Sequence, residues 1–154
     1  MITVKKTISL PIQAWRTYKT TLTQAAKATL AAIPSQAQGD ITLVLSNDAQ
    51  IRALNRQFRS LDSPTDVLSF NIDALNPQNG RKYLGDVIIS LERAQEQAVS
   101  AAHPLTAELA LLTVHGILHL CGYDHEQPAD QAQMWALQEA ILASLEIHLP
   151  LSNG

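Results

Sequence analysis

Along this chain, segments rich in β-branched residues alternate with segments whose apolar residues recur at helical spacing. The first kind predicts strands and the second predicts helices. Residues 2–9 and 40–46 are rich in β-branched residues, which is typical of strands. Between them, apolar residues recur at helical spacing from Trp15 to Ile33, which predicts a core-facing helix. The predicted elements are strands at 2–9, 40–46, 67–70 and 83–89 and helices at 11–33, 48–59, 91–103, 105–120 and 130–149.

This order of elements predicts an α/β fold with a mixed sheet of about four strands packed with helices. A length of 154 residues with 46% hydrophobic residues suits a single domain over 1–154 with one adequate core. In the helix at 48–59 we expect Ile51, Leu54 and Phe58 to face inward, and we expect a polar loop at 71–82. The order of the strands in the sheet cannot be deduced from the sequence.

The predicted helix at 105–120 is apolar nearly all round, so we expect it to run through the core. Its histidines, His115 and His119, are four residues apart and therefore project from the same face. Two histidines at this spacing are often only hydrogen-bonded at a helix surface. Glu108, seven residues before His115, lies on the same face and is a candidate acceptor for a ring N–H.

The residues just after this helix favour a metal site. Gly122 is suited to end the helix in a left-handed turn, which brings His125 back toward the first two imidazoles. Three histidines leave one position of a tetrahedral ion open, as in catalytic zinc sites. We therefore expect one Zn²⁺ per chain, held by His115, His119 and His125.

The same spacing occurs in the metzincin zinc peptidases, which carry a glutamate general base directly after the first histidine. Here that position is Gly116, so the usual base for peptide hydrolysis is missing. Cys121 follows His119 by two residues and points to another side of the helix, so we interpret it as a packing residue.

The glycine variant of the motif, continued by Gly122, Tyr123 and Asp124, resembles the YbeY family of bacterial endoribonucleases. Three other segments resemble that family in the same order: Leu54, Asn55, Phe58 and Arg59; residues 64–70, which read PTDVLSF; and residues 84–90, which read LGDVIIS. The resemblance covers roughly residues 41–142. It departs from the family at Gln138, where members commonly carry glutamate.

The resemblance implies a zinc-dependent endoribonuclease that cuts single-stranded RNA and acts in 16S rRNA 3′ end maturation and ribosome quality control. It implies rRNA and the ribosome (30S and 70S) as partners, with no DNA and no membrane. It marks Arg59 as catalytic, and a guanidinium suits phosphate oxygens. Asp124 and Glu108 are candidates to support the metal ligands or to serve as general base.

Arg52, Arg56 and Arg59 form one basic stripe on the helix at 48–59. A solvated surface is the default interpretation of such a stripe, and RNA binding by Arg52 and Arg56 is the alternative. All 11 Lys and Arg lie between Lys5 and Arg93, although the formal net charge is −3. The chain therefore presents a basic wall beside the histidines, or none if folding intermingles its two halves.

Cys121 is the one cysteine, which agrees with a reducing compartment, and no stretch resembles a signal peptide or a membrane span. We therefore expect a cytoplasmic protein. Two other functions stay open at this point. One is a metal-dependent peptidase of metzincin type, against which the missing glutamate counts. The other is a ribosome-associated binding protein in which the metal is structural.

Overall fold

The computed structural model describes residues 1–124 and 126–149, and it confirms the predicted α/β fold. Ten elements follow one another along the described chain. They are β1 (Ile2–Lys6), α1 (Ile12–Ala32), the 3₁₀ helix η1 (Ser35–Ala37), β2 (Asp40–Ser46), α2 (Asp48–Arg59), β3 (Val67–Leu75), β4 (Lys82–Ser90), α3 (Leu91–Ala101), α4 (Leu105–Leu120) and α5 (Pro128–Ser144).

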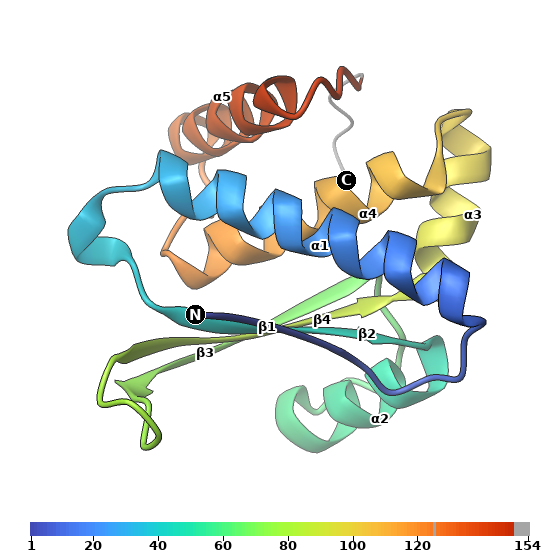
Figure 1. Ribbon diagram of the computed structural model, residues 1–154, viewed down its shortest axis with the longest axis horizontal. Helices are drawn as coiled ribbons and strands as arrows, with labels where there is room; N and C mark the ends of the chain where they lie inside the picture. Colours follow the sequence, from blue (N-terminus) through green and yellow to red (C-terminus); the bar gives the residue numbers. More distant parts are fainter. Residues whose placement is uncertain (125, 150–154) are drawn as a thin grey trace.

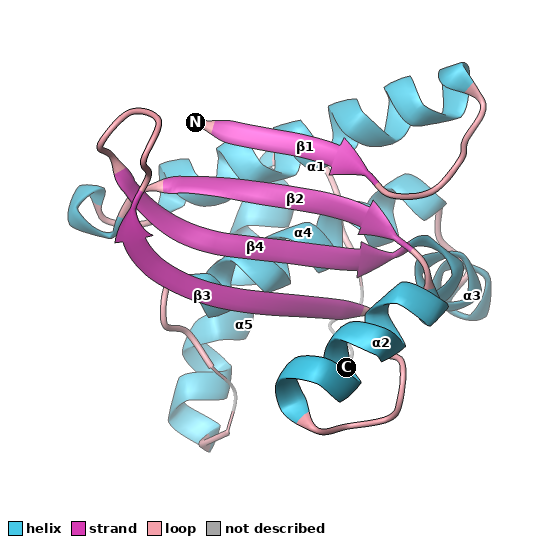
Figure 2. Cartoon of the chain, turned by 90° about the horizontal axis from the view of Figure 1, so that it is seen from below, coloured by secondary structure: helices cyan, strands magenta, loops and turns pink. Residues whose placement is uncertain are grey.

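The four described strands form one mixed sheet in the order β1-β2-β4-β3. β1, β2 and β4 run parallel to one another, whereas β3 runs antiparallel to β4 and forms an edge of the sheet (Figure 2). The helical connections α1 and α2 supply the crossovers that parallel strands need. The sheet order places β3 at an edge, where one side of its backbone is open to ligands or side chains.

Helices cover both faces of the sheet unequally. α1 and α4 lie on one face and α5 packs above them, while α2 lies alone on the other face (Figure 1). Alternation along β4 explains this, because Val87 and Ile89 point into the larger core whereas Ile88 packs with Ile51 of α2. No single described helix is long and apolar enough to span a membrane. Among the described helices, α3 and α4 reach the needed length and apolar content only when taken together, and they are bent by 117° at their connection.

α4 is the central helix of the larger core, as its sequence predicted. Eleven of its residues are buried, and it contacts the sheet, α1, α3 and α5. Two side chains of β3 reach its backbone: Ser69 Oγ donates to the Gly116 carbonyl at 2.9 Å, and Asn71 Nδ2 donates to the Leu120 carbonyl at 3.1 Å. These bonds tie the edge strand to the last turns of α4.

Some details differ from the sequence prediction. β1 ends at Lys6 rather than at residue 9, α5 spans 128–144 rather than 130–149, and much of the expected loop at 71–82 belongs to the β3–β4 hairpin. Phe58 does not face inward: its side chain is 62% exposed and packs edge to face on Phe70 at 5.7 Å between ring centroids. Helical periodicity alone did not show that α2 covers only part of the sheet.

Gly116 lies where α4 approaches the sheet most closely. A Cβ atom at this position would stand 2.6 Å from Cγ1 of Val87, 3.2 Å from Cγ2 of Val67 and 3.3 Å from Oγ of Ser69. Real Cβ atoms essentially never show the first of these distances, so any side chain here would force Val87 or α4 to shift, and packing favours glycine. A glutamate here, as in the metzincin peptidases, would have no room for its side chain.

We predict that Gly116→Ala lowers the free energy of unfolding by about 1 to 3 kcal/mol, because the new methyl group overpacks the contact with Val87. Urea denaturation followed by circular dichroism measures this change. The matched control is Gly116→Ala combined with Val87→Ala, which removes the clashing methyl. Its destabilisation should be smaller than the sum of the two single changes, and strict additivity would show that the two positions do not clash.

Candidate active site

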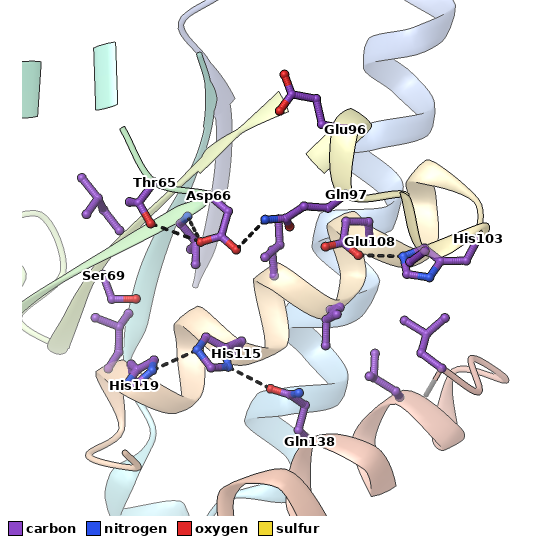
Figure 3. A pocket seen from close by; sticks show the side chains of 18 of the residues that line it. Thr65, Asp66, Ser69, Glu96, Gln97, His103, Glu108, His115, His119 and Gln138 are labelled. Atoms are coloured by element: carbon purple, nitrogen blue, oxygen red, sulfur yellow. Dashed lines mark hydrogen bonds and ion pairs between the residues drawn. The ribbon is translucent and has the colours of Figure 1, made fainter. Parts of the chain in front are cut away.

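A cavity of about 1120 Å³ opens between the edge strand and the helices. The end of α2, the start of β3, and helices α3, α4 and α5 all contribute to its walls. Figure 3 shows its polar side chains in two groups along α4, with His115 and His119 in one group and Glu108 in the other. The cavity therefore brings together the histidines, Arg59 and Glu108, which are separated in the sequence.

The two histidines of α4 point their Nε2 atoms at each other. Nε2 of His115 lies 3.0 Å from Nε2 of His119, and the rings meet at 77° with their centroids 4.6 Å apart. Two nitrogens bound to one tetrahedral zinc ion at about 2.0 to 2.1 Å stand roughly 3.3 Å apart. The pair is thus close to the arrangement that two ligands of one ion require.

Gln138 of α5 sets the tautomer of His115. Its side-chain oxygen lies 3.0 Å from Nδ1 of His115 (Figure 3). An amide oxygen only accepts hydrogen bonds, so Nδ1 carries the proton and Nε2 keeps its lone pair toward His119. An outer hydrogen bond of this kind is the usual support of a metal-binding histidine. Gln138 is buried, which holds the contact in place.

α4 ends as predicted, in a turn that depends on glycine. Gly122 has a φ of 95°, its amide donates to the His119 carbonyl at 3.1 Å, and the Tyr123 amide donates to the Leu118 carbonyl at 3.0 Å. This pair of bonds is the Schellman motif, which reverses the chain after a helix. Gly122 is thus needed for its backbone conformation.

His125, the third predicted ligand, lies outside the described residues. Within 1–124 and 126–149, no group of three His, Cys, Asp or Glu side chains could hold a metal ion. The zinc ligand set therefore stays a prediction. Two of its three members, His115 and His119, are seen to converge.

The side chain of Arg59 has a different environment from the other two arginines of the basic stripe. Its guanidinium NH2 donates to the Ser69 carbonyl at 2.8 Å, lies 5.4 Å from the centre of the Phe70 ring, and lines the cavity. Arg52 instead forms a two-pronged ion pair with Asp62, at 2.8 and 3.2 Å. Arg56 lies 3.8 Å from the same carboxylate. Only Arg59 among the three faces the histidines' cavity.

Glu108 shares the cavity with the histidines, but its hydrogen bond goes elsewhere. Its Oε2 lies 2.7 Å from Nε2 of His103, a residue that no signal in the sequence singled out. Glu108 therefore does accept from a histidine ring, but from His103 and not from the histidines of its own helix. Burial raises the pKa of the Glu108 carboxyl above its ordinary value, and the bond from His103 opposes that shift.

Two other carboxylates have structural partners. Asp66 accepts hydrogen bonds from its neighbour Val67 and from Gln97 of α3, so it fixes the start of β3 at the cavity wall. Asp124, a candidate support for the metal, accepts from the Glu126 amide and lines a smaller hollow beside Cys121. Its predicted role receives no support from the described contacts.

Of the two charge arrangements that the sequence left open, a basic wall beside the histidines is not the one found at the main cavity. Among the described lining residues, Arg59 is the one Arg or Lys, whereas Asp66, Glu96 and Glu108 are acidic. Folding has therefore intermingled the two halves of the chain around this site. Positive charge at the cavity is concentrated at one point, near β3.

Comparison with known proteins agrees with the resemblance in the sequence. A family model described as Endoribonuclease YbeY matches residues 3–146. An endoribonuclease YbeY of Moorella thermoacetica is 46% identical over 132 residues, which cover 81% of this chain and 85% of that protein. The protein of the same name from Chloroflexus aggregans is 46% identical over 128 residues, covering 79% and 84% of the two chains.

A solution structure of a Thermotoga maritima protein has a similar fold, with a TM-score of 0.54 and 24% identity over 95% of this chain and 92% of that one. The chain belongs to the YbeY endoribonuclease family. Membership makes it a hydrolase that acts on RNA. The family prediction from the sequence is confirmed.

Cys121 provides a test of the packing at the end of α4. Burial raises the pKa of its thiol to about 11, so at pH 8 very little reactive thiolate is present. We predict that iodoacetamide modifies Cys121 in the folded protein at least roughly a hundredfold more slowly than in 8 M urea, where a thiol has a pKa of about 8.5. Mass spectrometry of timed samples measures the two rates, and equal rates would contradict the raised pKa of this partly buried thiol.

Proposed function

We propose that this protein is a zinc-dependent endoribonuclease specific for single-stranded RNA, acting in 16S rRNA 3′ end maturation and ribosome quality control. The observation that supports this proposal most directly is the convergence of His115 and His119 in a cavity that also holds Arg59. The family supports RNA as the substrate. The zinc ion, the ribosomal role, the 30S and 70S partners and a cytoplasmic location are parts of the proposal.

His115, His119 and His125 would hold the ion through their imidazoles. The 3.0 Å separation of the first two Nε2 atoms and the tautomer set by Gln138 both fit that role. When bound, zinc with three neutral ligands supplies a Lewis acid and lowers the pKa of coordinated water toward 7.

Arg59 is proposed to stabilise the phosphate in the transition state. Its guanidinium is charged at every relevant pH and presents several N–H groups, of which one is occupied by the Ser69 carbonyl. Phosphodiester cleavage places negative charge on the non-bridging oxygens, which a fixed guanidinium can neutralise. The bond to Ser69 and the contact with Phe70 hold the group at the cavity wall before substrate arrives.

The peptidase alternative is less well supported. Peptide hydrolysis in metzincins uses a glutamate at the position of Gly116, where this chain has no side chain and a new one would clash with Val87. The alternative of a binding protein with a structural metal differs in one measurable respect, because it predicts RNA or ribosome affinity without any cleavage.

We predict that the purified protein contains about one zinc ion per chain and cuts single-stranded rRNA fragments until a chelator is added. His119→Ala should lose both metal and cleavage, because one converging nitrogen is removed. Gln138→Leu should keep the fold but bind zinc about 10- to 100-fold more weakly, since the support of His115 is lost. Metal analysis and competition with a zinc indicator measure these changes, and cleavage undiminished by chelator would contradict the role of the ion.

A second prediction separates Arg59 from its neighbours. Arg59→Ala should keep zinc and the fold and slow cleavage by roughly a hundredfold or more, as expected for loss of a charge-stabilising donor. Arg56→Ala is the matched control: it removes an exposed arginine from the same helix, and cleavage should change little. Single-turnover assays with a labelled single strand compare the two variants. If Arg59→Ala cut at the parental rate, Arg59 would have no part in the reaction.

A further inference from the structure

The cavity contains a second polar group that the proposed reaction does not use. Glu108 lies near the start of α4, and His103 lies in the short connection between α3 and α4. Their side chains are joined by a 2.7 Å hydrogen bond, and Glu108 is only 4% exposed. Both residues line the same cavity as His115 and His119 (Figure 3).

One oxygen of Glu108 is left over for a ligand. Oε2 is occupied by His103, and within the part of the chain that the structure describes Oε1 has no hydrogen-bond partner. Figure 3 shows this oxygen turned away from His103. Oε1 is not fully enclosed by protein atoms, and Glu108 lines the cavity, so this oxygen borders the open space. A hydrogen bond from a ligand N–H to a shielded acceptor of this kind stabilises the complex, because the acceptor is otherwise left without a partner.

The chemistry of Glu108 points to a nucleobase rather than a phosphate. A carboxylate repels phosphate oxygens, whereas it accepts hydrogen bonds from the exocyclic amino groups of bases. Glu108 precedes His115 by seven helical residues, or about 10 Å along α4, so it meets a nucleotide next to the one being cut. Leu111 and Leu112 on α4 and Leu142 on α5 give this part of the cavity apolar walls suited to the faces of a base.

We propose that Glu108, held in place by His103, determines base specificity by accepting a hydrogen bond from the exocyclic amino group of a nucleobase flanking the cleaved phosphate. This inference rests on the proposed ribonuclease function. Cytosine, adenine and guanine carry such an amino group, whereas uracil presents a carbonyl oxygen instead. The enzyme should therefore disfavour uracil at that position.

The test compares cleavage of single-stranded oligo-C and oligo-U of equal length. The parent protein should cut oligo-C about five- to tenfold faster in kcat/KM, as expected for one hydrogen bond. In Glu108→Gln the amide oxygen stays with the His103 N–H, so the NH₂ group faces the cavity and matches the uracil carbonyl. The ratio of C to U cleavage should then fall to one or below.

Glu96→Gln is the matched control, because it makes the same chemical change at an exposed position lining the same cavity. Its C to U ratio should equal that of the parent. An unchanged ratio in Glu108→Gln, with cleavage retained, would overturn the inference and leave the proposed function intact. Absence of RNA cleavage by the zinc-loaded parent protein would overturn both.

A change in the substrate tests the same contact without altering the protein. Oligo-C built from N4,N4-dimethylcytidine keeps the ring but has no amino N–H to donate. The parent protein should cut it at about the rate of oligo-U. Cleavage at the rate of unmodified oligo-C would overturn the inference even if Glu108→Gln failed to fold.

Discussion

The close contact between α4 and the sheet at Gly116 is the constraint on which the site depends. Without a Cβ atom, the helix settles against Val87 and Val67, and Ser69 bonds the Gly116 carbonyl. This contact fixes the rotation of α4 about its own axis. The directions of His115 and His119 depend on that rotation, since turning a helix by one residue moves its side chains by about 100° around the axis. Packing and the chemistry of the site are therefore set by one position.

Two polar side chains of α4, His115 and Glu108, are each oriented by a residue outside the helix. Gln138 of α5 fixes the tautomer of His115, and His103 in the connection between α3 and α4 holds Glu108. Because α4 is buried on most sides, its side chains have little freedom of their own, and the partners from other helices decide which atom faces the cavity. The polar side chains of the cavity are thus arranged along α4, with Glu108 toward the start of the helix and the two histidines toward its end.

The sequence predicted what local signals determine. The limits of α4 and the turn at Gly122 depend on side chains close in sequence, and the structure confirms them. The ion-pair partners of charged side chains could not be predicted from local signals. The spacing of Arg52 and Arg59 on one helix gives them the same expected environment. In the structure Arg52 pairs with Asp62 in the following loop, whereas Arg59 bonds the Ser69 carbonyl. The sheet order and the exposure of Phe58 likewise depend on contacts between segments that are far apart in the sequence.

The bond from Arg59 to the Ser69 carbonyl has a consequence for solubility. β3 is an edge strand, and unpaired carbonyls on such a strand invite pairing with another molecule. The bulky, charged side chain of Arg59 blocks that open side at Ser69. Replacing it therefore removes a guard against self-association as well as a cation. Sedimentation of such variants belongs beside their kinetics, so that activity lost to aggregates is not mistaken for lost chemistry.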